Sequence, residues 1–241
     1  MEHDFQMDTE TLKSIFKGFE SKNILIIGDV MCDAYWWGGV NRISPEAPVQ
    51  VVDIEKKEYR LGGAANVAVN LKRLGANPLL CSVIGDKQEG ETFCGLLDEE
   101  GIHDHYLIRS NERPTTVKTR VMGDKHQLLR MDNEKKHPLN KGEQDGILTK
   151  VQEGLQQADA VLFVDYDKGV LTPELIHETI KLANDKGIPT IVDPKKRNFF
   201  EYKDVTLFKP NLNELQNGLD MEFSNPVEND ELRDAVRSEE H

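Results

Sequence analysis

Short apolar stretches alternate with amphipathic stretches along most of the chain. The first apolar stretch, residues 23–29 (NILIIGD), is continuous and ends in Gly-Asp, as a strand buried on both faces does before its loop. Stretches of the same kind predict further strands at residues 79–84, 160–164, 189–192 and 206–208. Helical spacing predicts helices at residues 64–74, 89–100, 141–157 and 173–186. This alternation indicates an α/β fold, with a mostly parallel sheet, helices on both faces, and ligands beyond the carboxyl ends of the strands.

The two ends of the chain carry additional helical patterns. Leu12, Ile15, Phe16 and Phe19 follow the i, i+3, i+4, i+7 spacing. This spacing predicts a first helix that packs one apolar stripe against a core. Residues 225–241 predict a polar helix that frays toward the C-terminus.

Two segments interrupt the alternation of strands and helices. Residues 48–54 (PVQVVDI) are extended in character, and residues 115–131 contain a hairpin-like Gly123-Asp124 between extended flanks. These segments predict a small β element that is separate from the main sheet.

Composition narrows the class of protein. The 241 residues carry a net charge of -13, which argues against a nucleic-acid partner, since binding to phosphate backbones needs a surplus of Lys and Arg. The three cysteines are widely spaced and form no CxxC pair, so neither a disulfide framework nor a zinc site is indicated. The N-terminus lacks the pattern of an export signal, and no run of about 18 apolar residues predicts a membrane span. We expect a cytoplasmic protein.

Residues 60–66 (RLGGAAN) lead into the predicted helix at 64–74. Paired glycines let a ligand approach the backbone, and the N–H groups of a first helical turn favour oxygen-rich or anionic groups. A tight strand-to-helix turn without a ligand is the alternative interpretation.

Several motifs in the first hundred residues resemble, in order and spacing, the N-terminal part of the PfkB (ribokinase-like) sugar kinases. They are GD at 28–29, GGAAN at 62–66, LGA at 74–76 and IGD at 84–86. Three more motifs resemble the heptose 7-phosphate kinase branch of that family: NRISPEAP at 41–48, DYDKG at 165–169 and DPK at 193–195. The resemblance implies one ribokinase-like domain over residues 1–241, incomplete at its C-terminal end, with lid segments at about 36–57 and 115–131.

The resemblance also implies which residues bind the substrate, a small sugar phosphate. The residues expected to hold sugar hydroxyls are Asp29, Gly62, Gly63 and Asn66, with Asp33 from the same loop as Asp29. A loop carboxylate that caps nearby N–H groups is the alternative for both aspartates.

Four cations are candidates for binding the phosphate that the sugar already carries, namely Arg42, Lys118, Arg120 and Lys195. We favour Arg42, because it lies inside the branch-specific motif, together with Lys195. An ordinary solvated cation is the alternative for each.

Residues 209–214 (KPNLNE) match the family's N-x-x-E motif. By resemblance, Asn211 and Glu214 serve ATP, and Glu214 organises Mg²⁺. A helix cap by Asn211 with Glu214 at the third helical position is compatible with that role. Members of the family carry a Gly-Ala-Gly-Asp segment whose aspartate is taken as the catalytic base. No such segment occurs in this sequence, so the catalytic base is unassigned.

The resemblance therefore predicts ATP-dependent phosphorylation of D-glycero-D-manno-heptose 7-phosphate at its anomeric hydroxyl, and a homodimer formed through the β lid. Two alternatives stay open. One is another PfkB sugar kinase of fructokinase or ribokinase type, and the other is a non-catalytic sugar-phosphate-binding remnant.

Overall fold

The structure, a computed structural model, describes residues 8–124 and 126–221. The polar helix predicted at 225–241 lies outside the described residues. The α-helices in the described part are α1 (Thr9–Phe19), α2 (Ala64–Arg73), α3 (Gln88–Glu99), α4 (Lys141–Gly154), α5 (Pro173–Asp185) and α6 (Leu212–Leu219). A short 3-10 helix, η1 (Lys196–Asn198), follows the ninth strand.

The main sheet has six strands in the order β10-β9-β8-β1-β4-β5, and every neighbouring pair is parallel. Its strands are β1 (Asn23–Gly28), β4 (Asn77–Gly85), β5 (Leu107–Ser110), β8 (Ala160–Val164), β9 (Thr190–Asp193) and β10 (Leu207–Phe208). The predicted strands are thus confirmed to within a few residues, and β5 is a strand that the pattern did not predict. The mostly parallel α/β sheet is confirmed.

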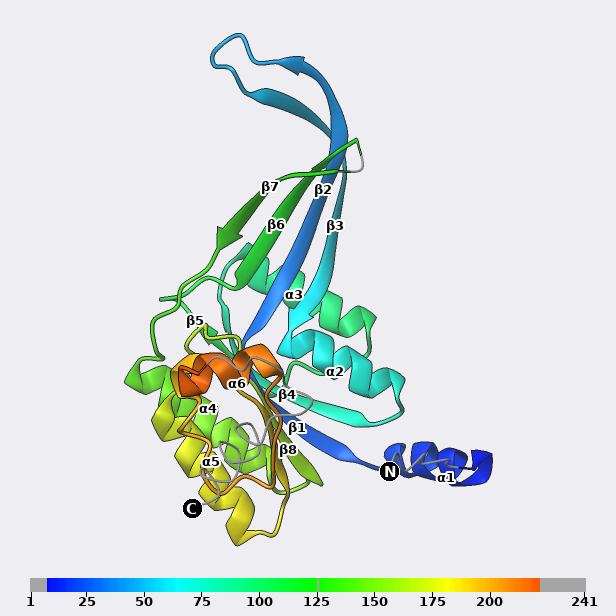
Figure 1. Cartoon of the computed structure of the whole chain (residues 1–241), viewed down its shortest axis with the longest axis vertical. Helices are drawn as coiled ribbons and strands as arrows, with labels where there is room; N and C mark the ends of the chain where they lie inside the picture. Colours follow the sequence, from blue (N-terminus) through cyan, green and yellow to red (C-terminus); the bar gives the residue numbers. More distant parts are fainter. Residues whose placement is uncertain (1–7, 125, 222–241) are drawn as a thin grey trace.

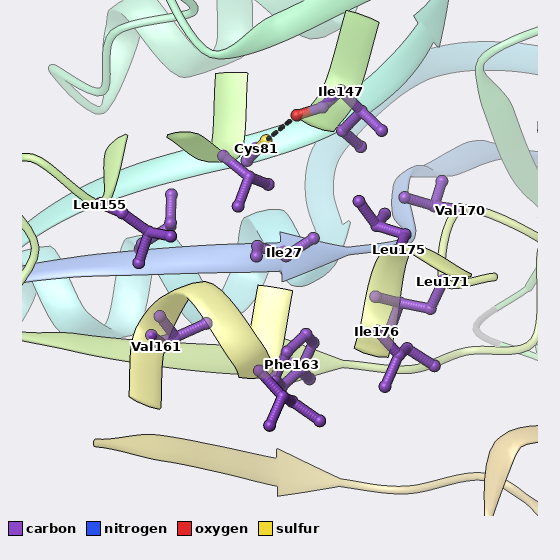
Figure 2. Packing of buried hydrophobic residues seen from close by; sticks show 14 of the residues in the cluster. Ile27, Cys81, Ile147, Leu155, Val161, Phe163, Val170, Leu171, Leu175 and Ile176 are labelled. Atoms are coloured by element: carbon purple, nitrogen blue, oxygen red, sulfur yellow. Dashed lines mark hydrogen bonds between the residues drawn. The ribbon is translucent and has the colours of Figure 1, made fainter. Parts of the chain in front are cut away.

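Alternate residues of β1 point into two separate cores. Leu25 and Ile27 belong to a cluster that includes Phe163 and residues of α4 and α5. Figure 2 shows Ile27 and Phe163 within this cluster. Ile26 belongs to a second cluster that includes Phe93 of α3 and the alanines of α2. Helices therefore cover both faces of the sheet, as a continuously apolar strand requires.

A second sheet of four strands projects from the main body (Figure 1). Its order is β3-β2-β6-β7, with β2 (Val30–Ile43), β3 (Gln50–Gly63), β6 (Thr116–Gly123) and β7 (His126–Asn133). The predicted hairpin is confirmed: β6 and β7 pair antiparallel, and Asp124 in the turn has φ of 47°. The strands extend beyond the predicted segments 36–57 and 115–131, because β2 begins two residues after β1 and β3 runs directly into α2.

The prediction for the first helix is half right. Residues 9–19 are helical, with Asp8 as the cap that accepts a hydrogen bond from Thr11 N, but α1 buries none of its residues. Phe16 is 50% exposed, and the helix stands away from the body of the molecule (Figure 1). The expected packing of its apolar stripe against the core is wrong, because helical periodicity does not say whether a partner surface lies within reach. No helix in the described part of the chain has the length and apolar character to cross a membrane.

Candidate functional site

A cavity of about 650 Å³ opens where the second sheet meets the main body. The second sheet, the start of α2 and the loop after β8 contribute to its wall. The residues from these elements that matter below are Asp33, Tyr35, Arg60, Gly62, Gly63, Asn66, Lys118, Arg120, Arg130 and Tyr166. Part of the cavity lies at the carboxyl edge of the parallel sheet, where Tyr166 follows β8 and where such folds bind ligands, and it continues along α2 to Arg73 and the end of α3.

The inner end of the cavity brings together four residues that the sequence predicted. Asp33 on β2 lies beside Gly62 at the end of β3, and a Cβ on Gly62 would stand 2.5 Å from the Asp33 carboxylate oxygen Oδ2. Gly63 has φ of 58° and precedes the first turn of α2, where Asn66 also lines the cavity. Glycine is needed at both positions, since a side chain at 62 would fill the site and the backbone at 63 is left-handed.

Asp29 lies elsewhere. Its side chain is 1% exposed and accepts hydrogen bonds from the backbone N–H groups of Tyr166, Lys168 and Val170 at 2.9, 3.1 and 3.0 Å. Burial raises the pKa of Asp29, and the three N–H groups only partly offset this. The carboxylate holds the loop after β8 in place, as in the capping alternative, so its geometry does not support the predicted contact with a sugar hydroxyl.

Arg42 is also far from the cavity within one chain. It lies near the outer end of β2, nine residues beyond Asp33, a distance of about 30 Å at the usual rise of a strand. There it pairs with Asp53 on β3, with 3.2 Å between nitrogen and oxygen. The predicted contact of Arg42 with a phosphate in this cavity is therefore not met by the arrangement of the single chain.

Four other cations point toward the cavity. Arg60, Lys118, Arg120 and Arg130 come from three different strands and all line its wall. The sequence considered Lys118 and Arg120 but missed Arg60 and Arg130. The sequence could have indicated Arg60 and Arg130, because charged residues two positions apart on a strand share one face of the sheet. Such pairs occur in EYR at 58–60 and RMD at 130–132.

Ion pairs hold these cations in place. Arg120 donates to Asp33 at 2.6 Å, and Asp132 lies 3.3 Å from Lys118 and 3.0 Å from Arg130. Burial, which raises the pKa of Asp132, is outweighed by these two cations, and its pKa lies below the ordinary value. The two carboxylates therefore fix the cations at the cavity wall.

Glu134, just beyond β7, links the second sheet to the main body. It lies 3.0 Å from Lys168, 3.2 Å from Lys136 and 3.6 Å from Lys118. Burial raises the pKa of Glu134, but hydrogen bonds from Lys168 and Lys136 outweigh it and hold the pKa below its usual value. The same carboxylate thus touches a cavity residue, Lys118, and the loop that Asp29 holds.

A second group of predicted residues gathers at the start of α6. Asn211 accepts a hydrogen bond from Glu214 N at 2.9 Å, and the Glu214 side chain accepts from Asn211 N at 2.8 Å, a complete capping box. The other oxygen of Glu214 pairs with Lys195, whose ammonium lies 5.9 Å from the centre of the Tyr166 ring. The structure therefore brings Lys195 to the predicted nucleotide residue Glu214 and close to Tyr166, which lines the cavity.

This group suits the phosphates of a nucleotide better than a free metal ion. A lysine and the exposed N–H groups of a helix start favour anionic oxygens. Among the described residues, no cluster of three or more His, Cys, Asp or Glu side chains could hold a metal. Glu214 alone could meet Mg²⁺ that arrives with a nucleotide, since this ion keeps several waters and relies on phosphate oxygens.

Known proteins similar in sequence point to one family. Residues 21–239 match the family described as pfkB family carbohydrate kinase. The bifunctional protein HldE of Pelobacter propionicus is 40% identical over 210 residues, covering 87% of this chain and 43% of that protein. The bifunctional protein HldE of Coxiella burnetii is 44% identical over 198 residues, covering 82% and 41%. The chain thus spans about two fifths of the length of these curated relatives.

Solved structures of low identity share the fold. Phosphofructokinase-2 from Escherichia coli, in a tetrameric inhibited form, has a TM-score of 0.66 at 20% identity, covering 90% of this chain and 69% of that one. Arabidopsis thaliana ribokinase, complexed with ribose and ATP, has a TM-score of 0.63 at 18% identity, covering 91% and 68%. The ribokinase-like fold predicted from the motifs is confirmed. Since the family match covers most of the sequence and the fold agrees with it, this chain belongs to the pfkB family of carbohydrate kinases.

Proposed function

We propose that this chain takes part in the ATP-dependent phosphorylation of D-glycero-D-manno-heptose 7-phosphate at its anomeric hydroxyl, giving the 1,7-bisphosphate for ADP-heptose and lipopolysaccharide core precursors. The observation that carries the proposal is the cavity in which Asp33, Gly62, Gly63 and Asn66 meet inside a carbohydrate-kinase fold. The branch-specific motif at 41–48 and the relatives named HldE favour a heptose over other sugars.

The chain's own residues have distinct tasks in this proposal. Asp33 and Asn66 offer the paired acceptors and donors that neighbouring sugar hydroxyls require. Gly62 and Gly63 let the ring approach the backbone. ATP, when bound, supplies the phosphoryl group, and its accompanying Mg²⁺ neutralises charge on the phosphates. Asn211, Glu214 and Lys195 would hold the phosphate end of the nucleotide, and no residue of this sequence is assigned as the base.

The second sheet would act as a lid over the sugar. Its cavity-facing residues line the same cavity as the start of α2, so that a small movement of the sheet would exclude water from the bound substrate. The lid segments of the proposal are the four strands β2, β3, β6 and β7 rather than two short stretches.

The opposite side of the second sheet suits a second copy of the chain. Trp36, Val121 and Leu129 lie in register on this side, and Leu129 is 55% exposed. Trp36 Nε1 is enclosed yet has no hydrogen-bond partner among the described residues. A cytoplasmic homodimer through this face would cover the apolar residues.

Titration calorimetry of the purified chain with heptose 7-phosphate and with fructose 6-phosphate tests the substrate, followed by an assay of ADP release on addition of Mg-ATP. Heptose-selective binding supports the proposal, and ADP release would extend it to catalysis. Preference for fructose 6-phosphate would favour another PfkB kinase. Binding of neither sugar phosphate would overturn the assigned cavity.

Light scattering of the wild type and of Leu129→Glu tests the dimer. The wild type is expected at twice the monomer mass, and the variant at the monomer mass. Leu74→Glu, which places the same change on an exposed residue of the main body, is the control. A monomeric wild type at all concentrations would refute the dimer.

A further inference from the structure

An aromatic ring of the main body lines the cavity and has no task in the function proposed above. We infer that Tyr166, in the loop after β8, is a specificity-determining residue, and that its ring is the apolar platform on which one face of the bound sugar ring packs. The inference rests on the proposed function and deepens it, because it names the group that distinguishes a closed sugar ring from an open-chain polyol phosphate.

A closed sugar ring presents two kinds of surface to a protein. Its edges carry hydroxyls, for which Asp33 and Asn66 offer hydrogen bonds. Its faces consist largely of C–H groups, which pack best against an apolar surface, and a flat aromatic ring has the matching shape. Tyr166 lines the same cavity as Asp33 and Asn66 and is 41% exposed, so its ring is open to a ligand.

Two other tyrosines belong to the cavity lining, but neither offers a free ring face. The ring of Tyr35 lies 4.9 Å from the guanidinium carbon of Arg60 and 5.2 Å from that of Arg120, so both cations contact it already. Tyr59 precedes Arg60 on β3, and successive side chains of a strand project from opposite faces of the sheet. Among the cavity residues that the structure describes, Tyr166 is therefore the aromatic ring best placed to receive a sugar.

Two buried carboxylates fix the backbone on either side of this ring. Asp29 Oδ2 accepts hydrogen bonds from the N–H groups of Tyr166 and Lys168 at 2.9 and 3.1 Å. Asp165 Oδ1 accepts one from the N–H group of Asp167 at 2.8 Å. Asp167 has φ of 56°, a left-handed conformation that is uncommon for a residue with a side chain and that clusters at functional sites. The loop therefore holds an exposed ring on a fixed backbone, as a binding platform requires.

The same loop is tied to the residues that would hold the nucleotide. Asp165 Oδ2 accepts a hydrogen bond from Asn198 Nδ2 at 3.0 Å, which connects the loop to η1, the short helix that follows Lys195. The Lys195 ammonium lies 5.9 Å from the centre of the Tyr166 ring and pairs with Glu214. A sugar packed on this ring would lie beside the proposed place of the nucleotide phosphates, and phosphoryl transfer requires that proximity.

Calorimetry with matched variants tests the platform. Tyr166→Leu removes the flat ring and should weaken the binding of heptose 7-phosphate on the order of 10-fold. Tyr166→Phe keeps the ring and should bind within about threefold of the wild type. The control is Phe16→Leu, which replaces an exposed aromatic residue of α1 outside the cavity and should bind like the wild type. Circular dichroism checks that each variant is folded.

Two further ligands separate a sugar platform from other tasks of the ring. Sorbitol 6-phosphate, an open-chain polyol phosphate, has no ring face, so Tyr166→Leu should change its affinity by less than about threefold. Mg-ADP reports on Lys195 and Glu214, and should also bind Tyr166→Leu within about threefold of the wild type. Loss of Mg-ADP binding alone would mean that the ring only supports Lys195, and would overturn the inference.

The remaining outcomes distinguish this inference from the proposed function. Unchanged binding of heptose 7-phosphate by Tyr166→Leu would overturn the inference and leave the proposed function standing. Equal losses in Tyr166→Leu and Tyr166→Phe would also overturn it, because they would place the contact at the hydroxyl. If the wild type prefers fructose 6-phosphate and Tyr166→Leu weakens that binding, the platform is supported and only the proposed sugar is lost. A wild type that binds neither sugar phosphate would overturn both.

Discussion

The two sheets of this protein differ in how far their side chains are buried. In the main sheet, eight of the nine residues of β4 are buried, whereas every residue of β7 in the second sheet is exposed. The main sheet is enclosed by helices on both faces, whereas α2 and α3 contact the second sheet at β2 and β3 and leave β7 exposed. The second sheet instead presents charge on one side and apolar residues on the other. The contrast teaches that burial, and with it stability, is concentrated in the first sheet, whereas the second sheet offers the exposed surface for the ligand and the second copy that we propose.

The largest expected effect is a difference in the free energy of unfolding between a variant of the core and a variant of the second sheet. Phe163→Ala removes a fully buried ring and should lower the free energy of unfolding by about 3 to 5 kcal/mol. Leu129→Ala should change it by less than about 0.5 kcal/mol. Urea denaturation gives both values, measured at low protein concentration because association would stabilise the second sheet. Equal losses for the two variants would contradict the division of tasks.

Substitutions of Asp29 and Asp33, which lie where the two sheets meet, should affect stability and binding separately. In Asp29→Asn, an amide N–H₂ would face one of the buried N–H groups that the carboxylate now accepts, which costs about 1 to 3 kcal/mol of stability. Asp33→Asn should instead weaken sugar binding with little change in the urea midpoint. A stable Asp29→Asn that no longer binds sugar would restore Asp29 to the binding site.

Glycine substitutions provide a sharper test of the cavity. Gly62→Ala places a Cβ 2.5 Å from Asp33 Oδ2 and 2.8 Å from Met31 Cγ, and is expected to weaken sugar-phosphate binding by about tenfold or more, equivalent to about 1.4 kcal/mol. Gly95→Ala, in α3 with open space around it, should keep the affinity and raise the stability by about 0.5 to 1 kcal/mol. Calorimetry and thermal unfolding of both variants check the pair, and normal binding by Gly62→Ala would place the sugar elsewhere.

The smallest expected effect concerns pH and the link between the sheets. Because the pKa of Glu134 is lower in the folded chain than its ordinary value of 4.5, its contribution to stability is present above pH 4.5 and is lost as the pH falls through the folded value. Glu134→Gln should therefore reduce stability at pH 7 by up to about 1 kcal/mol and flatten the decline in acid. Urea unfolding at several pH values below 5 measures the slope. If Glu134→Gln and the wild type lose stability with falling pH at the same rate, the lysines around Glu134 do not stabilise its ionised form.

The pattern of apolar residues predicted most of the main sheet because its signal is local. A strand such as β1, buried on both faces, must be apolar throughout, and the helices that cover it must repeat at 3.6 residues. The strand β5 was missed because LIRS is short and half polar. The apolar spacing of α1 correctly predicted a helix but wrongly predicted its burial. Such spacing shows which face a helix could bury, and it does not show whether another element lies beside that face.

In the candidate site too, the local sequence did not determine which residues meet across long distances in the chain. The motifs identified Gly62, Gly63 and Asn66, whose roles depend on the local turn into α2. The sequence ranked Asp29 above Asp33, four residues away, but the choice depends on which carboxylate meets the N–H groups of a loop some 140 positions later. Arg42 was favoured from its motif, yet the length of β2 removes it from the cavity.

The sequence by itself determined the family, the parallel sheet and the glycine turn that opens α2, because each depends on the order of neighbouring residues. Only the tertiary structure decided which charges act together. Arg60, Lys118, Arg120 and Arg130 are separated by up to 70 positions and become one surface through the pairing of four strands. Register is a property of the folded sheet, set by burial where the two sheets meet and by the turns, and register gathers these scattered cations on one wall of the cavity.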